Sequence, residues 1–572
     1  MEQFLETVAG ADPVLVEVYI GFMRWTAPAL ALLILLRCCL PLLSFRREPE
    51  IWAWLYMEDG NKFAITHWEN VIGRNEKCDV VVDFPTVSRN HAVLTRYDDG
   101  SWTVSDADSK SGTMVNGERG KIFAIQEDDV ISVGGVDLIF APITARQEQR
   151  LAELRTKAAS LFDSVLNLFL LSLFQCLICV GFLMTAQDGH GVQILLGFGG
   201  IMLCQWALLG FYAGIKRPSF EVETVAFFLC TMGMAAIATV IPRDMLKQLI
   251  SMIMGIGLFL TIGWSLRDLE RAKQMRYVAA AAGVGLLLVT LLFGRNYYGA
   301  KNWLAIGPLS LQPSELSKVC FIFAGASTMD RLMDKRNLTL FIVYSVVICG
   351  CLALMNDFGA ALIFFVAFLV IAYLRSGSVG TVALAITALV LAGFVALRIA
   401  PHALRRFASW RHIWQMPLDA GFQQTRALMC IASGGLLGLG PGQGWMENVF
   451  AADSDMIFAT ISEEWGLLLA VMMVGAIGAL AVFTVRSAIV GRSSFYTIGA
   501  CTAAAIMLMQ VILNALGTVD VVPLTGVTFP FVSNGGSSMI GMWGLLAFVK
   551  AADTRQNGSF AVRMNAGRDE NE

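Results

Sequence analysis

The chain has 572 residues, of which 56% are hydrophobic and 15% are charged, and its mean hydropathy is +0.63. Soluble domains average roughly 45–50% apolar and about 25% charged residues, so the composition excludes a single soluble enzyme of this size. The net charge of −3 excludes a strongly basic surface, and we expect no nucleic-acid partner.

Residues 1–50 are expected to form an N-terminal tail and a single transmembrane helix. The apolar run from Val14 to Leu43 exceeds the roughly 20 residues that are needed to cross a bilayer. Acidic residues precede this run and Arg46-Arg47 follows it, which is the reverse of a signal peptide. Because Lys and Arg favour the cytoplasmic side, we expect the N-terminus to lie outside the cell.

Residues 51–145 are polar and alternate short β-type runs with turn signals such as Asn116-Gly117. The clearest runs are Asp79–Asp83, Ala92–Arg96 and Trp102–Ser105. Many short strands separated by regular turns predict an all-β sandwich. The charged stretch that follows, residues 146–160, is expected to form a helical linker.

Three motifs lie within about 45 residues of this region. They are Ile72-Gly73-Arg74, Val87-Ser88-Arg89-Asn90-His91 and Gly112-Thr113-Met114-Val115-Asn116-Gly117. Their types and order resemble the forkhead-associated (FHA) family. The resemblance implies a cytoplasmic domain, inserted between membrane helices, that binds a partner protein through a phosphothreonine.

The FHA resemblance also implies which residues contact the phosphopeptide. Arg74 and Ser88 match the family's phosphate contacts, and a phosphate dianion is best held by a guanidinium and a hydroxyl on adjacent loops. Arg89 adds charge beside them, and Asn116 is expected to contact the peptide. Ser111 stands where the family usually has an Asn that binds the peptide backbone. This shorter donor leaves open a degenerate FHA fold that serves as a docking module.

Residues 161–551 contain about twelve apolar runs, which together with the N-terminal helix give about 13 spans of a polytopic α-helical membrane protein. Lys and Arg gather in alternate loops, which places the FHA region and the tail 552–572 in the cytoplasm. The runs lie near 161–185, 191–214, 221–241, 246–265, 276–294, 314–331, 338–355, 357–375, 379–399, 456–485, 494–518 and 533–551.

The long loop from Ala400 to Asp455 falls on the outer side in this alternation. It nevertheless keeps several arginines, Arg405 and Arg406 among them. We interpret it as an anion-binding surface. The alternative is that long loops escape the charge rule.

Four groups of residues between Gly299 and Val549 resemble, in order, the RodA/FtsW/SpoVE (SEDS) family. The resemblance implies a peptidoglycan glycosyltransferase of the bacterial cytoplasmic membrane. Such an enzyme polymerises lipid II on the outer face, releases undecaprenyl diphosphate, and has a single-span class B penicillin-binding protein as its transpeptidase partner. The four groups are Gly299–Trp303 with Gln312–Lys318, Asn356–Gly359, Gly421–Gly466, and Gln510–Ser538.

The polymerisation needs a carboxylate to take a proton from the attacking sugar hydroxyl, and cations to bind the departing diphosphate. Asp455 matches the family's catalytic Asp and is expected to be the general base. Asp453 stands two residues earlier, where the family has a His. It either raises the pKa of Asp455 by repulsion or shares a Mg²⁺ or Mn²⁺ ion with it. The alternative for Asp455 is a helix cap only.

The resemblance also implies a set of cavity residues. Glu315 and Lys318 lie at i and i+3 and so share one helix face, where the alternative is an internal salt bridge. Asp357 matches a family carboxylate, with Asn356 in place of the family's Pro, and is expected to support the site. The remaining expected cavity or diphosphate contacts are Gln312, Ser537, Arg405 and Arg406.

Two other classes of function remain open from the sequence. A transporter that flips the lipid-linked precursor would use the same cavity and cations but would need no general base. A non-catalytic scaffold for cell division or cell shape would use the FHA domain to recruit a phosphorylated protein. Asp455 separates these possibilities, because only the enzyme needs a proton acceptor there.

Overall fold

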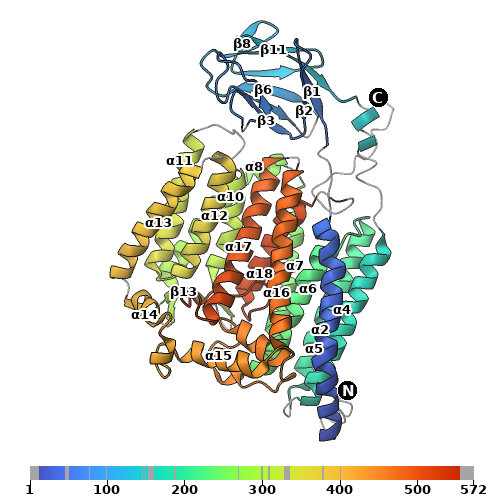
Figure 1. Cartoon of the computed structure of the whole chain (residues 1–572), viewed down its shortest axis with the longest axis vertical. Coiled ribbons are helices and arrows are strands. Elements are labelled where there is room, and N and C mark those ends of the chain that lie inside the picture. The colour runs from blue at the N-terminus through green and yellow to red at the C-terminus, as the bar shows by residue number, and fades with distance from the viewer. Residues whose placement is uncertain are drawn as a thin grey trace.

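The structure is a computed structural model with a helical bundle and a β-sandwich beyond one end of the bundle (Figure 1). It describes residues 12–555 except for 45–49, 77, 98–99, 145, 149, 152–159, 186–188, 268, 298–299, 307–308, 328–334, 377–378, 400, 492 and 554. The expected linker 146–160 and tail 552–572 therefore lie largely outside the described residues.

The β-sandwich confirms the expected all-β fold. One sheet has the strand order β2-β1-β11-β10-β7-β8 and the other has the order β4-β3-β5-β6-β9. The pairs are antiparallel, apart from the short parallel pair of β3 and β4. The strands are β1 Ala53–Met57, β2 Lys62–Ile65, β3 Glu69–Gly73, β4 Val80–Val81, β5 Ala92–Arg96, β6 Trp102–Asp106, β7 Thr113–Val115, β8 Glu118–Gly120, β9 Ile122–Ile125, β10 Val130–Val133 and β11 Val136–Pro142.

The core of the sandwich follows from the alternation of side chains along each strand. In β6, Trp102 and Val104 are buried while the residues between and after them are partly exposed. The Trp102 ring packs against Phe140 of β11 with centroids 5.1 Å apart, which joins the two sheets. The loops that carry the three FHA motifs thus project from a rigid scaffold.

The helices of the bundle coincide with the apolar runs of the sequence, and each of the twelve expected ranges contains one. The first described helix is α2, Pro13–Ser44. The others are α4 Leu161–Thr185, α5 Gly191–Gly214, α6 Glu221–Val240, α7 Met245–Ser265, α8 Leu269–Gln274, α9 Arg276–Phe293, α10 Pro313–Ser327, α11 Lys335–Leu354, α12 Phe358–Ser376, α13 Val379–Ile399, α16 Ile457–Ile489, α17 Ser494–Thr518 and α18 Gly536–Ala551.

Nine helices in the described part of the chain are long and apolar enough to cross a membrane. The others that fall on expected runs, α10, α11, α13 and α18, are not among the nine. A polytopic α-helical membrane protein is therefore confirmed, while the count of about 13 spans stays a prediction.

The expected outer loop forms a compact layer at the end of the bundle opposite the β-sandwich (Figure 1). It contains α14, Pro401–Ser409, and α15, Phe422–Gly434, with 3-10 turns at Ile413–Gln415 and Met446–Asn448. A small sheet lies at the same end, built from β12 Arg295–Tyr297, β13 Ala300–Ile306 and β14 Leu309–Leu311.

Candidate active site and phosphopeptide-binding site

Asp455 lies at the end of the outer layer, two residues before α16 begins, and is partly buried. Its backbone is fixed by Asn514 of α17. The Asn514 amide donates to the carbonyl oxygens of Asp455 at 3.0 Å and Val527 at 2.8 Å. One side chain therefore ties the Asp455 turn to the loop between α17 and α18.

The Asp455 carboxylate and the Arg406 guanidinium both lie beside Gly526 of that loop. A Cβ at position 526 would lie 3.2 Å from Asp455 Oδ2 and 4.0 Å from Arg406 Nη1. Arg406 itself donates to the Leu524 carbonyl at 3.3 Å. The fold thus places a carboxylate and a cation close to the same point beside Gly526, which is the pairing that a diphosphate-releasing transfer needs.

We expect Gly526→Ala to lower polymerase turnover about ten- to hundredfold, because a small misplacement of a catalytic group has effects of this size. The φ of +70° at position 526 is unfavourable for alanine, and the added methyl group presses on the carboxylate. Gly475→Ala on α16 is the control, because nothing lies within 4 Å of its Cβ position. Equal initial rates for Gly526→Ala and the control would contradict this arrangement.

Burial raises the pKa of the Asp455 carboxyl to about 6, with Arg406 opposing the rise and the Asp453 and Asp357 carboxylates adding to it. Repulsion from Asp453, which the sequence suggested, therefore contributes to the raised pKa of Asp455, but burial contributes more. A pKa near 6 leaves Asp455 ionised at neutral pH and makes it a stronger proton acceptor than an ordinary aspartate.

Two departures from the family pattern contact each other. Asn534 stands where the family usually has Tyr, and its amide donates to Asp453 Oδ2 at 2.7 Å. The Asn534 backbone N–H also donates to the Asp453 carbonyl at 2.8 Å. Burial raises the pKa of Asp453, and this amide contact opposes the rise. The two substitutions form a matched pair that holds the turn before Asp455.

The metal ion expected at Asp455 and Asp453 stays a prediction. One oxygen of Asp453 already accepts from Asn534, and no group of three or more His, Cys, Asp or Glu side chains suited to a metal lies in the described part of the chain. A Mg²⁺ or Mn²⁺ ion at Asp455 and Asp453 would need substrate oxygens to complete its coordination.

A second polar cluster is centred on Asp357, at the start of α12. Asn302 and Gln312 donate to Asp357 Oδ2 at 3.0 and 3.3 Å, and Ala360 N donates to Oδ1 at 3.0 Å. Ser537 Oγ accepts from the Gln312 backbone N–H at 2.8 Å. The sequence-predicted Gln312, Asp357 and Ser537 are thus brought together.

Asn356 explains why proline is absent before Asp357. Its φ is +60°, a left-handed conformation that proline, fixed near −65°, does not adopt and that asparagine tolerates. The Asp357 cluster packs against the Gly526 loop, because a Cβ at Gly359 would lie 3.1 Å from the Thr525 carbonyl oxygen.

Glu315 and Lys318 form a buried ion pair on α10, with Nζ and Oε2 2.7 Å apart. The salt bridge that the sequence left as the alternative is therefore present, and a role of the pair in a substrate cavity stays a prediction. Arg405 lies on α14, but its side chain is outside the described residues.

Three residues near these sites had no role assigned from the sequence. Asn514 and Gly526 stand in the quoted motifs, but their contacts with Asp455 depend on loops far apart in the chain. The sequence motifs assigned no role to Asp520. Its carboxylate accepts from Arg411 N at 3.0 and 3.2 Å and from Gln424 at 3.4 Å, so it fastens the outer layer to the end of α17.

The loops that carry the residues predicted to bind the phosphopeptide are hydrogen-bonded to one another. Arg74 N donates to the Ser88 carbonyl at 3.0 Å, which joins the first two motif loops. His91 is fully buried and joins the third, since Ser88 N donates to its Nδ1 and its Nε2 lies 3.1 Å from the Gly112 carbonyl. Arg74 and Arg89 are exposed beside Ser88.

The other two residues predicted to contact a phosphopeptide, Ser111 and Asn116, differ in how their side chains are hydrogen-bonded within the domain. Ser111 Oγ donates to the Thr86 carbonyl at 3.4 Å. Asn116 uses its side-chain amide and oxygen within the domain, for Asp129 at 2.7 Å and Val130 N at 2.9 Å. Its contact with a peptide stays a prediction, and the structure gives it a turn-stabilising role.

Arg119 of β8 is a cation that the motif pattern did not reveal. Its guanidinium covers Gly112, where a Cβ would lie 2.5 Å from Nε. Gly112 adjoins Ser111, so Arg119 stands beside the position of the absent Asn. Only the strand pairing of Thr113 with Gly120 brings β8 there.

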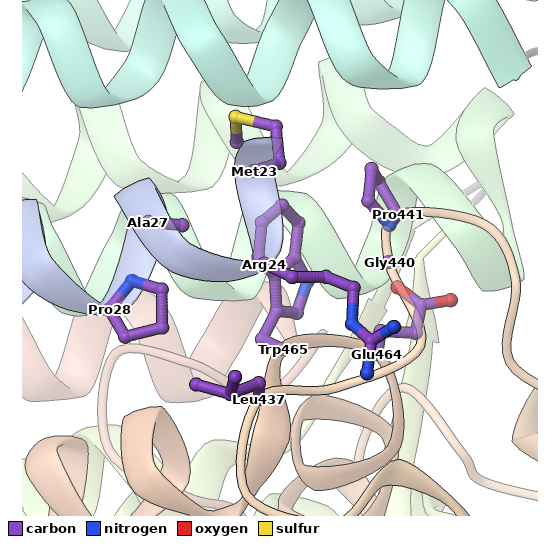
Figure 2. Close-up of a pocket in the computed structure, with 9 residues that line it drawn as sticks. All are labelled: Met23, Arg24, Ala27, Pro28, Leu437, Gly440, Pro441, Glu464 and Trp465. Carbon is purple, nitrogen blue, oxygen red and sulfur yellow. The ribbon is translucent and has the colours of Figure 1, made fainter. Parts of the chain in front are cut away.

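One pocket lies between α2 and the outer layer, and no residue of the Asp455 site lines it (Figure 2). The Arg24 side chain extends towards the Glu464 carboxylate across it. Most of its other lining residues are apolar. The pocket marks the packing of the N-terminal helix on the bundle.

These observations define a polytopic membrane protein with an acid–cation site at one end of its bundle and a β-sandwich with phosphate-reading loops at the other. Residues 223–558 match the FtsW/RodA/SpoVE family of cell cycle proteins, and residues 70–134 match the FHA domain. The first match covers more than half of the chain. The chain belongs to the FtsW/RodA/SpoVE family and carries an FHA domain.

The chain is similar to several known proteins over its C-terminal half. The chain is 29% identical over 324 residues to the peptidoglycan glycosyltransferase RodA of Mycobacterium tuberculosis, covering 53% of this chain and 69% of the relative. It is 32% identical over 309 residues to a probable peptidoglycan glycosyltransferase FtsW of Nitrosococcus halophilus, covering 50% and 78%. A solved chain of a peptidoglycan synthase complex is 26% identical with a TM-score of 0.48, covering 58% and 96%.

The family match does not include the first helices of the chain. It begins at residue 223, so α2, α4 and α5 precede it. Only α6, α7 and α9 then stand as long apolar helices before the Gly299–Trp303 motif.

Proposed function

We propose that this protein is a peptidoglycan glycosyltransferase that polymerises lipid II on the outer face of the cytoplasmic membrane. The observation that carries the proposal is the Asp455–Gly526–Arg406 arrangement, which pairs a carboxylate of raised pKa with a guanidinium. We further propose that the FHA domain, at the other end of the bundle, faces the cytoplasm. The N-terminus and the outer layer then lie outside (Figure 1).

In the proposed reaction, Asp455 accepts the proton of the attacking sugar hydroxyl. The hydroxyl oxygen forms a bond to the anomeric carbon of the second substrate, and the bond from that carbon to the lipid diphosphate breaks. The leaving diphosphate carries away the bonding electron pair, and Arg406 offsets its negative charge. The Asp357 cluster and the Glu315–Lys318 pair position the surrounding helices. Lipid II is thus substrate, and undecaprenyl diphosphate is the leaving group.

We propose two protein partners. A class B penicillin-binding protein would cross-link the glycan product, and a phosphothreonine-bearing protein would bind at Arg74, Ser88 and Arg89. The decisive experiment is polymerisation of labelled lipid II by the purified chain, with and without its transpeptidase partner. Glycan chains from the wild type support the enzyme. Their absence under both conditions, with lipid II translocation observed instead, would establish a transporter.

We expect the polymerisation rate to depend on one group with a pKa of about 6. Asp455 accepts a proton only when ionised, so the rate should fall about tenfold for each pH unit below 6 and level off above it. Initial rates with saturating lipid II from about pH 4.5 to 8 measure this dependence. A rate that stays flat through pH 6 would remove Asp455 as the base.

A further inference from the structure

The FHA domain is fastened to the membrane bundle through Glu69, the first residue of β3. Ser494 N donates to Glu69 Oε2 at 3.0 Å, and the Ser494 hydroxyl also donates to Oε2. Ser493 Oγ donates to Oε1 at 3.4 Å. More than 420 residues of chain separate the two sides of this contact.

The contact has a favourable electrostatic basis. Ser493 is the N-cap of α17, and Ser494 is the first residue of that 25-residue helix. The first turn of a helix has N–H groups without partners within the helix and a partial positive charge. A carboxylate from another domain satisfies both. Beside it, Trp68 packs against the apolar cores of the sandwich and of the bundle.

The other end of the same helix holds the candidate catalytic residue. Asn514 lies 20 residues after Ser494, about 30 Å along the axis, and donates to the Asp455 and Val527 carbonyls. Between these ends α17 is mostly buried against α16, α12 and α18. A rigid, buried helix with a partner at each end transmits a change in its placement from one end to the other.

Arg74 remains accessible to a phosphopeptide while Glu69 contacts α17. Glu69 is the first residue of β3 and Arg74 directly follows its last, so the two stand five residues apart along an extended strand, about 16–17 Å. Arg74 is exposed. The domain can therefore hold α17 at one end of β3 and read a phosphothreonine at the other.

We propose that the FHA domain is a positioning element of the polymerase: Glu69 fixes the cytoplasmic end of α17, and through Asn514 this sets the Asp455 turn at the outer end. Glu69 touches no substrate and acts through Asn514. This inference rests on the proposed glycosyltransferase function.

The test compares full-length Glu69→Ala, Glu69→Gln and Glu118→Ala in lipid II polymerisation. Glu118 is an exposed acid of the same domain on β8, at the side away from the bundle (Figure 1), and is the control. We expect Glu69→Ala to lower kcat about fivefold or more at unchanged KM, in the range of typical coupling between sites. Glu69→Gln keeps an acceptor oxygen and should retain most of the rate, and Glu118→Ala should match the wild type.

Hydrogen exchange supplies a readout that does not depend on catalysis. The amides of residues 494–497 should exchange faster in Glu69→Ala than in Glu118→Ala, while phosphopeptide affinity stays at the wild-type value. If Glu69→Ala does not fold, Ser493→Ala with Ser494→Ala removes both hydroxyls from the membrane side and should give the same kcat loss.

Two outcomes overturn the inference. A Glu69→Ala protein with wild-type kcat would refute the positioning role and leave the proposed glycosyltransferase intact. A wild-type protein that makes no glycan, alone or with its transpeptidase, would refute the proposed function and with it this inference.

Discussion

Asp455→Asn is expected to reduce lipid II polymerisation by about 10²–10⁴-fold, the usual contribution of a positioned general base. The substitution keeps the size of the side chain but removes its ability to accept a proton at neutral pH. The contact from Asn514 reaches the Asp455 backbone and is therefore retained. The measurement is glycan formation from labelled lipid II by purified wild type and variant, with the transpeptidase partner present.

We expect Asp455→Asn to lose activity without losing thermal stability. A raised pKa means that the folded state disfavours the charged form of Asp455, so a neutral side chain relieves a cost. We expect the Tm of Asp455→Asn to equal or exceed that of the wild type. An inactive variant with a lowered Tm would instead indicate a structural role, and an active variant would favour the transporter or the scaffold.

Arg74→Ala is expected to abolish measurable phosphothreonine-peptide binding, a loss of about 100-fold or roughly 2–3 kcal/mol, because charge-assisted bonds to a dianion are strong. The contact that shapes the loop uses the Arg74 backbone N–H and Ser88 carbonyl, so the domain should stay folded. The measurement is the affinity of the full-length protein for phosphorylated and unphosphorylated versions of one peptide.

Lys62→Ala is the matched control for this prediction. It removes a cation from β2, which lies in the other sheet from β3 and β5 and at the opposite edge of its own sheet from β7 and β8. The basal polymerase activity of Arg74→Ala, without any peptide, should remain at the wild-type level, since Arg74 follows the end of β3 opposite to Glu69. Loss of basal polymerisation in a folded Arg74→Ala protein would defeat this modular picture.

The sequence predicted the elements well because each had a strong local signal. Twelve apolar runs became helices, and the runs at Ala92–Arg96 and Trp102–Ser105 became β5 and β6. Motif order was sufficient to indicate both families. The span count was less accessible, because α18 begins at Gly536, three residues later than the apolar run suggested.

The site was predicted only in part, for reasons visible at single residues. Asp453 and Asn534 looked like two separate departures, and only folding showed that they are hydrogen-bonded to each other. Asn356 looked like a lost proline, and its positive φ explains the exchange. Asn116 lies in a motif, but its side chain is hydrogen-bonded within the domain, to Asp129 and to the Val130 backbone N–H.

By itself the sequence determined a membrane-spanning chain with an inserted β domain, and it identified Asp455 and Arg74 as candidate reactive and binding residues. Hydrophobicity and short motifs are local properties, so a linear reading recovers them. The tertiary structure decided what contacts Asp455, why residue 526 is glycine, and that Glu69 meets the start of α17. These contacts join residues tens to hundreds of positions apart, and their hydrogen bonds depend on how the helices pack.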